Sequence, residues 1–329
     1  MSRRILTGVC ALVLVAVLAA ISGSDYVVRL FNLAAIAAIA VLGLNFALGY
    51  AGLISICQSV FVGLGAYCLA ILTTRYGWPT LASVPAAIVG TTAVSILVGY
   101  PLLRVRGHYL ALATLGLTVC FGIVLANWQE VTGGLDGISR IPGLAIAGRE
   151  IAGERHFLFL AVSVLAVVAS GSAIFQRTQQ GRAMIAVRDD ETAAAMSGVN
   201  VTGVKIAAFA VSAAYGALSG CLFALHVRFI SPEDFGYMHS INYIAMLIVG
   251  GEGTVVGAIL GATVVTFLPE LMRGLGSAYL AFFGLLLLSI LVFLPHGVVS
   301  LLQMLPRLGR AVRQLGRRGR QSTLERIQP

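Results

Sequence analysis

The ten residues 33–42 have the sequence LAAIAAIAVL, in which every position is apolar. A water-exposed helix would carry polar residues on one face, and a strand of an outer-membrane barrel would alternate apolar with polar positions. This stretch does neither. It lies within the longer apolar run Val27–Leu48, which is long enough to cross a bilayer as a helix. The run therefore indicates a membrane-spanning helix and argues against a barrel.

The composition of the whole chain agrees with this interpretation. Of its 329 residues, 58% are apolar and only 11% are charged, and the mean hydropathy is +0.94. Soluble domains have about 45–50% apolar and about 25% charged residues, so this chain cannot build an ordinary water-facing surface. Many of its 38 glycines lie inside apolar runs, where small residues let helices approach closely. An integral membrane protein of the all-α class is predicted.

Seven apolar runs of spanning length precede residue 230: Ile5–Ser22, Val27–Leu48, Leu53–Thr74, Thr80–Leu103, His108–Asn127, Phe157–Phe175 and Val204–Val227. If each run crosses once, several arginines fall on one side: Arg3, Arg4, Arg104, Arg106, Arg177, Arg182 and Arg188. The positive-inside rule makes that side, and the amino terminus, cytoplasmic. Met1–Ser24 also has the pattern of a cleaved signal peptide, whose removal would leave the remaining topology unchanged.

The last third of the chain contains an interruption. Two apolar segments remain before the end of the chain, Ile241–Leu268 and Leu275–Leu294, and an arginine-rich tail follows them. The positive-inside rule places this tail in the cytoplasm, where we expect it to anchor the topology rather than to bind nucleic acid. Two complete crossings would place that tail outside. The run Gly250-Gly251-Glu252-Gly253 divides the first segment and predicts a re-entrant or sharply broken pair facing a pathway. The predicted fold is a polytopic bundle with about eight crossings and a broken helix pair near 241–268.

Patterns of known catalytic sites do not occur in the sequence. The only lysine, Lys205, is followed by Ile206, so no P-loop is present, and the five histidines show no HExxH spacing. The five cysteines are scattered singly, which favours neither a metal site nor a disulfide framework. An enzyme is therefore not predicted, and no catalytic or metal-binding residue is assigned.

One long polar segment, residues 176–200, is expected on the cytoplasmic side. Asp189, Asp190 and Glu191 precede an alanine run that ends near Gly198, which is the pattern of a short helix with acids at its start and glycine after its end. An ordinary loop is the alternative. A helix with small faces suits docking into a groove of a soluble partner.

At this point a family resemblance becomes specific. The segment 181–200 resembles the coupling loop of permease subunits of ABC importers, most closely the LivM-type branched-chain amino acid permeases. Further similar segments follow the family's order: residues 51–67, 106–115, 132–138, 230–232, 249–254 and 295–297. The resemblance covers roughly residues 25–300.

The resemblance implies an arrangement of domains and partners. Residues 1–303 would form the permease domain, with a coupling loop at 176–203 and an external loop at 128–156, and 304–329 a basic cytoplasmic tail. A second permease would complete the path, two ATPase subunits would bind ATP and Mg, and a periplasmic or lipid-anchored binding protein would deliver a small solute. This chain would itself hold no cofactor, and both of its termini would face the cytoplasm from the inner membrane.

Two groups of candidate site residues follow. The coupling loop comprises Gly181, Arg182, Ala183, Ala186, Arg188, Asp189, Asp190, Glu191, Ala193, Ala194 and Gly198. The translocation path is expected where polar residues occur within spans: Asn45, Ser55, Gln58, Ser59, Thr114, Thr118, Asn242, Tyr243 and Glu252. Glu252 is either a membrane-embedded functional carboxylate or a cap at the mouth of a shallow turn. Gln58 is favoured as a hydrogen-bonding residue between helices.

Three functions remain compatible with the sequence. The leading one is an ABC importer permease for branched-chain or similar amino acids. A permease for urea or short amides is a neighbouring alternative, and a non-transporting scaffold or receptor subunit belongs to a different class. ATPase stimulation by a solute-loaded binding protein separates the scaffold from the two transporters.

Overall fold

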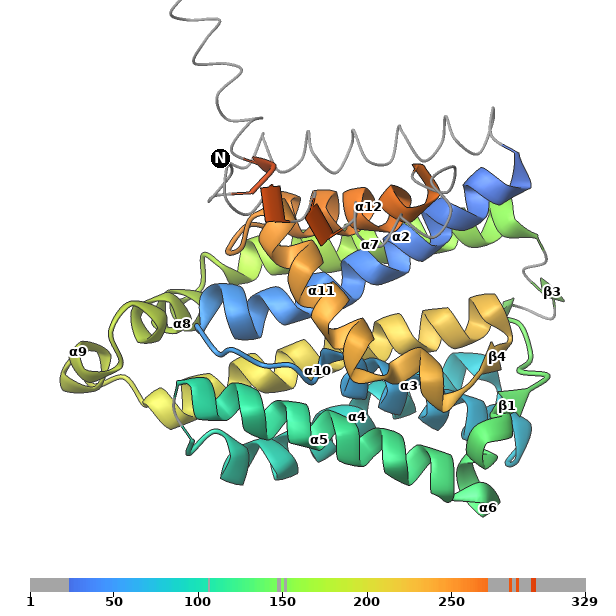
Figure 1. Cartoon of the computed structure of the whole chain (residues 1–329), viewed down its shortest axis with the longest axis horizontal. Coiled ribbons are helices and arrows are strands. Elements are labelled where there is room, and N and C mark those ends of the chain that lie inside the picture. The colour runs from blue at the N-terminus through green and yellow to red at the C-terminus, as the bar shows by residue number, and fades with distance from the viewer. Residues whose placement is uncertain are drawn as a thin grey trace, which may run out of the picture.

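The structure is a computed structural model that describes residues 24–105, 107–146, 149–150, 153–271, 284–285, 288–289 and 297–299. Within this part of the chain, five helices are long and apolar enough to cross a membrane: α2 with its π-helical continuation η1, together Asp25–Tyr50, then α4 (Thr80–Leu102), α5 (His108–Asn127), α7 (Glu154–Phe175) and α10 (Val201–Val227). Two shorter apolar helices are α3 (Gln58–Thr74) and α12 (Val255–Leu271). The expected all-α membrane bundle is confirmed for these residues (Figure 1).

Several expectations lie mainly or wholly outside the described residues. These are the first span at Ile5–Ser22, most of the last span at Leu275–Leu294, and the basic tail at 304–329. The predicted number of about eight crossings includes two of these segments and therefore stays a prediction.

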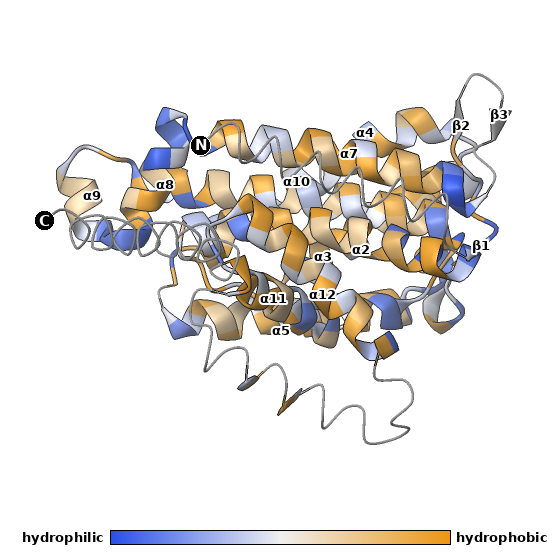
Figure 2. Cartoon of the chain, turned by 90° about the horizontal axis from the view of Figure 1, so that it is seen from above, coloured by the Kyte–Doolittle hydropathy of each residue, from blue (hydrophilic) through white to orange (hydrophobic). Residues whose placement is uncertain are grey.

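The two ends of the bundle differ in structure. One end carries the short strands and helical turns, and is called the strand end here: α6 (Gln129–Thr132), η2 (Gly134–Asp136), β1 (Ile138–Ser139), β2 (Ala145–Ile146), β3 (Arg149–Glu150), β4 (Phe229–Ile230) and η3 (Pro232–Phe235). β1 pairs antiparallel with β4, and β2 with β3. The other end, called the α8 end, carries α8 (Gln179–Asp189) and α9 (Glu191–Met196). Figure 2 shows apolar residues along the helices and hydrophilic ones gathered at both ends.

Helix α10 is the centre of the core and packs against α2, α3 and α4. Glycines make these contacts close. A Cβ atom added at Gly65 in α3 would lie 2.4 Å from the Cα of Ala217, and one at Gly220 would lie 1.8 Å from the carbonyl oxygen of Val62. No side chain fits at either position, so these contacts bring backbone against backbone.

The third predicted span begins later than the sequence indicated. Leu53–Thr74 was expected to be one helix, but residues 51–57, called the extended segment here, form neither helix nor strand, and α3 begins only at Gln58. Gly52 turns the chain with a φ of +68°, which favours glycine. The Ile56 amide donates to Thr114 Oγ1 at 2.9 Å, and its carbonyl accepts from Thr118 Oγ1 at 2.8 Å. These side chains of α5 replace the helical hydrogen bonds of Ile56.

The predicted break in 241–268 is present. Helix α11 (Tyr237–Gly250) ends at a turn in which Gly251 has a φ of +113° and Gly253 one of +75°, and α12 follows. Helix α12 runs antiparallel to α2: the rings of Phe267 and Phe31 lie 4.9 Å apart, and Tyr26 Oη donates to Glu270 Oε2 at 2.5 Å. The second arm of the broken pair, α12, therefore lies along α2 over most of that helix.

Candidate functional site

The structure divides the predicted site residues into three groups, apart from Asn242 and Tyr243 on α11. The first lies on α8 and α9. The second lies where the turn between α11 and α12 meets the end of α2, and contains Asn45 and Glu252. The third surrounds the extended segment 51–57, and consists of Ser55, Gln58, Ser59, Thr114 and Thr118.

The helix predicted after the acidic triplet is α9. Asp190 Oδ1 accepts hydrogen bonds from the amides of Thr192 and Ala193 at 2.7 and 3.0 Å, which caps the start of the helix. Gly198 follows its end with a φ of +84°. The sequence did not indicate that a separate helix, α8, comes first, although Thr178 caps it through the Gly181 amide at 3.2 Å.

Residues of the predicted coupling loop differ in what they face. Gly181 is buried and leaves no room for a side chain, since a Cβ there would lie 2.3 Å from the carbonyl oxygen of Phe175. Ala183 and Glu191 are half-buried. The exposed members are Arg182, Ala186, Arg188, Asp189, Asp190, Ala193 and Gly198. Ala194 was expected to form part of the docking face, but it is only 5% exposed and faces its own chain, whereas Met196 on the same helix is 88% exposed.

The only lysine of the chain fastens α9 to the bundle. Lys205 lies on α10, its side chain is 7% exposed, and its Nζ forms an ion pair with Glu191. A buried ammonium group requires such a partner. Sequence reasoning did not assign this role to Lys205, although a single lysine at the start of an apolar helix is a signal that could have found it.

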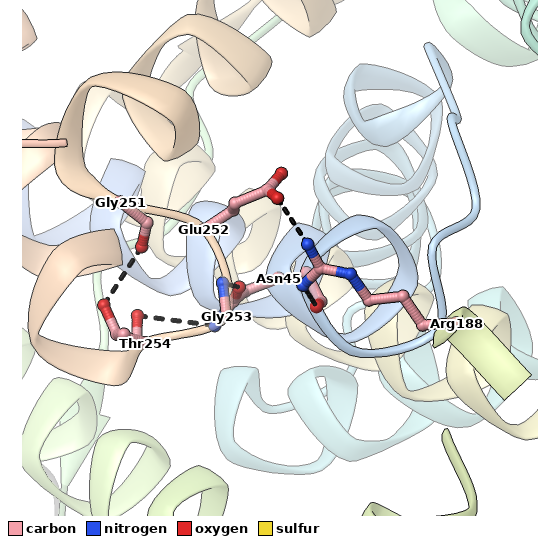
Figure 3. Close-up of polar contacts among 7 residues, drawn as sticks. Asn45, Arg188, Gly251, Glu252, Gly253 and Thr254 are labelled. Carbon is pink, nitrogen blue, oxygen red and sulfur yellow. Dashed lines mark hydrogen bonds and ion pairs between the residues drawn. The ribbon is translucent and has the colours of Figure 1, made fainter. Parts of the chain in front are cut away.

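Arg188 joins three segments of the chain. Its Nη2 lies 2.5 Å from Glu252 Oε1 in the turn after α11, and its Nη1 donates to the carbonyl oxygen of Gly49 at the end of α2 (Figure 3). The two charged side chains are 35% and 44% exposed, so solvent screens their attraction. The sequence had placed Arg188 in the coupling loop and Glu252 on the path. The structure brings them together.

Asn45 holds the same turn from beneath Arg188. Its side chain is buried, its Oδ1 accepts from the Gly253 amide at 2.8 Å, and its Nδ2 donates to Tyr50 Oη at 3.0 Å. Gln176, which precedes α8, donates to Tyr50 Oη and to the Gly253 carbonyl, the latter at 3.3 Å. Gly49 leaves no space for a side chain, since a Cβ there would lie 1.9 Å from Asn45 Oδ1. Tyr50, Gln176 and Gly49 were not predicted.

Glu252 therefore lies at the α8 end and is exposed. Glu252 was expected either to be a membrane-embedded carboxylate or to cap a helix at the mouth of a turn. It lies in the turn, but the cap of α12 is Thr254, whose Oγ1 accepts from the Gly257 amide at 3.1 Å. The Glu252 carboxylate faces Arg188 on α8, and the turn that carries it is fixed to α2 through Asn45.

The remaining path candidates around the extended segment are buried and hydrogen-bonded to other residues of the bundle. Gln58 donates to the carbonyls of Ala40 and Ser212 at 3.0 and 3.3 Å and accepts from Ser212 Oγ at 2.8 Å, as expected for a residue that bonds helices together. The hydroxyl groups of Ser59 and Ser240 lie 2.7 Å apart. Ser55 Oγ contacts the sulfur of Cys57 at 3.1 Å.

Two candidates on α11 stand apart from this group. Asn242 is exposed, and Tyr243 is half-buried against the core. Among the residues that the structure describes, no three His, Cys, Asp or Glu side chains lie together in a way that could hold a metal ion.

Comparison with known proteins places this sequence in a family. Residues 26–295 match the family described as branched-chain amino acid transport system, permease component. The chain is 34% identical over 284 residues to the high-affinity branched-chain amino acid transport system permease protein LivM of Salmonella typhimurium, covering 79% of this chain and 67% of that one. It is 27% identical over 262 residues to a probable LivM permease of Methanocaldococcus jannaschii, covering 74% and 71%.

A more distant relative is the autoinducer 2 import system permease protein LsrC of Escherichia coli O9:H4, at 28% identity over 230 residues and 64% of each chain. No solved structure matches. The family match spans most of the chain, including α2, the extended segment, α8, α9 and the turn between α11 and α12. The chain therefore belongs to the family of permease components of branched-chain amino acid transport systems.

Proposed function

We propose that this multi-pass membrane protein moves branched-chain amino acids into the cell as the translocation subunit of an ABC importer. The identity to LivM over most of the chain supports this solute class. The similarity to LsrC, whose name refers to a different solute, makes the choice of solute the part of the proposal that most needs an experiment.

The proposal includes partners that this chain requires. A second, homologous permease completes the path, and two separate ATPase subunits bind ATP and Mg and supply the energy. An external binding protein, periplasmic or lipid-anchored, delivers the solute. The chain holds no cofactor and performs no catalysis in this scheme. It lies in the inner membrane with both termini in the cytoplasm.

One observation supports a coupling role more than any other: the polar helix α8 is linked directly to the end of α2 and to the turn between α11 and α12. Arg188 makes both contacts from a single side chain. A force that displaces α8 therefore acts on a turn bordered by two apolar helices. We infer that ATPase movement enters at α8 and α9 and reaches α11 and α12 through this contact.

In this proposal the ATPases bind α8 and α9, and ATPase subunits of such importers work in the cytoplasm. The α8 end is therefore assigned to the cytoplasm. Met196 on α9 and Ile185 on α8 are 88% and 41% exposed. They give the α8 end an apolar surface that a soluble partner can contact. To test it, Met196→Glu is compared with Leu135→Glu, a matched change at the strand end, where Leu135 is 73% exposed. Only the first substitution should reduce co-purification of the ATPases at unchanged membrane abundance. Equal co-purification for both variants would contradict the assignment.

The solute is tested with the purified chain, its partner permease, ATPases and binding protein in lipid vesicles. We expect ATP-dependent uptake of leucine, isoleucine and valine, and stimulation of ATPase activity by the loaded binding protein. Uptake of urea or acetamide instead would support the alternative transporter. Absence of any uptake, together with ATPase activity that no loaded binding protein changes, would support a scaffold.

A further inference from the structure

The extended segment 51–57 runs from the α8 end, where Gly52 lies against Arg188, into the bundle. Its Ile56 is held by Thr114 and Thr118 of α5, six and ten residues after the start of that helix at His108. At about 1.5 Å per residue, these positions are about 9 and 15 Å along a helix of about 30 Å. At Ile56 the segment therefore reaches roughly a third to a half of the length of α5 from the α8 end.

Part of this segment has backbone groups without partners. Among the residues that the structure describes, no hydrogen bond is made by the amides of Ile54 and Ser55 or by the carbonyls of Leu53, Ile54 and Ser55. The neighbouring groups are bonded: the Leu53 amide donates to the Ala47 carbonyl at 2.8 Å, and Ile56 is bonded on both sides. The free groups thus form one continuous stretch.

Lipid cannot be what these groups face. Each unpaired backbone group in contact with hydrocarbon costs several kcal/mol, so irregular backbone at membrane depth occurs where it is buried in protein or borders water. Ile54 is 40% exposed and Gly52 is also exposed, so the segment is not completely buried by its own chain. The exposed side of Ile54 therefore faces the translocation path or the second permease that completes it, and the labelling experiment below separates the two, because only a residue on an aqueous path reacts fast.

The free groups include both kinds of hydrogen-bonding partner. Carbonyls accept from an ammonium group and amides donate to a carboxylate, so the stretch offers partners for both charges of a zwitterion. The exposed Ile54 side chain adds an apolar surface directly beside them. Discontinuous helices in transporters place such groups at solute sites.

We propose that residues 53–55 form a solute-binding subsite on the translocation path, which takes the α-ammonium and α-carboxylate groups of an aliphatic amino acid on the backbone and its side chain against Ile54. This inference rests on the proposed transport function and assigns its contact point. Ser55, predicted from sequence, then acts through its backbone, because its hydroxyl is directed to Cys57.

The test uses thiol labelling in the assembled complex in vesicles. Ile54→Cys is made in a variant whose five native cysteines are replaced, and is labelled with a water-soluble trimethylammonium methanethiosulfonate. Leu97→Cys is the matched control, because Leu97 is 76% exposed and lies five residues before the end of α4 at the same end of the bundle. We expect Ile54→Cys to react at least tenfold faster than Leu97→Cys. Equal, slow reaction of both would overturn the proposal.

Ligand protection then tests the chemistry. Leucine at millimolar concentration should slow labelling of Ile54→Cys at least threefold, and 3-methylbutylamine, which lacks the carboxylate, should slow it less. No slowing by leucine, or equal slowing by both compounds, overturns the subsite. Ile56→Cys serves as a second variant if Ile54→Cys does not assemble. Leucine uptake by the unmodified complex is measured in parallel, so that failure of the subsite and failure of the proposed function give different results.

Discussion

Reversing the charges of Arg188 and Glu252 together should restore part of the transport that either single reversal removes. The ion pair is partly exposed, so its coupling free energy is expected to be about 0.5–1 kcal/mol. Arg188 contributes more than Glu252, because it also donates to the Gly49 carbonyl, and hydrogen bonds to charged groups contribute about 1.5–3 kcal/mol. Arg188→Glu should therefore destabilise the chain by roughly 2–3 kcal/mol and Glu252→Arg by about 1 kcal/mol.

The experiment is a double-mutant cycle with two measurements. The free energy of unfolding is followed by tryptophan fluorescence during titration with sodium dodecyl sulfate, and ATP-dependent leucine uptake is measured in vesicles. Arg182→Glu is the control, because Arg182 lies on α8 but is bonded to the Arg177 carbonyl at 2.7 Å and not to Glu252. The double variant should recover uptake beyond the product of the two single losses. If the free-energy losses of the two single variants simply add in the double variant, direct coupling between α8 and the turn is refuted.

Three further outcomes are expected. Ala194→Trp should reduce membrane abundance while Met196→Trp leaves it unchanged, because only Ala194 faces its own chain; equal abundance would place both side chains on the outer face. Replacing Thr114 and Thr118 together by Val should lower the free energy of unfolding by about 2–4 kcal/mol, because each hydroxyl satisfies one buried backbone group of the extended segment; a loss below 1 kcal/mol would show that water replaces them. Gly198→Ala should cost about 1–2 kcal/mol through its left-handed backbone alone, since no atom lies within 4 Å of the added Cβ, and the same SDS titration measures it.

The local sequence was sufficient to predict the features that are determined by interactions between residues close together in the chain. The apolar helices follow from runs of about 20 apolar residues, and the start of α9 follows from Asp190, whose side chain caps the amides two and three residues later. The break after α11 follows from glycines that adopt positive φ values. Each of these features needs only residues within one turn or one span.

The remaining features depend on residues distant in the sequence. Helix α3 begins late because Thr114 and Thr118, about sixty residues further on, bond the backbone of Ile56. The pairing of Arg188 with Glu252 joins positions 64 residues apart, so neither side chain indicates the other in the sequence. The burial of Ala194 is decided by α8 and α10, which pack against α9.

The arginine distribution was a weaker guide to orientation than it appeared from the sequence. The argument used Arg104, Arg177, Arg182 and Arg188, which lie towards the α8 end. The strand end also carries arginines, among them Arg140 next to β1, Arg228 next to β4 and Arg155, which lies 3.8 Å from Asp25. Counting positive charge over the described loops therefore does not separate the two ends, and the proposed orientation depends on α8 and α9.

The glycine contacts between α11 and α12 have a consequence for how the protein is made. Helix α11 has 14 residues, or about 21 Å, which is shorter than the roughly 30 Å hydrocarbon layer that a helix must cross. A Cβ at Gly261 would lie 1.9 Å from the Met246 carbonyl oxygen, and one at Gly250 would lie 2.0 Å from that of Gly257. Two helices joined this closely, backbone against backbone, are expected to leave the insertion machinery as a preformed hairpin. Helix α11 would then enter the membrane only after the ribosome has synthesised α12.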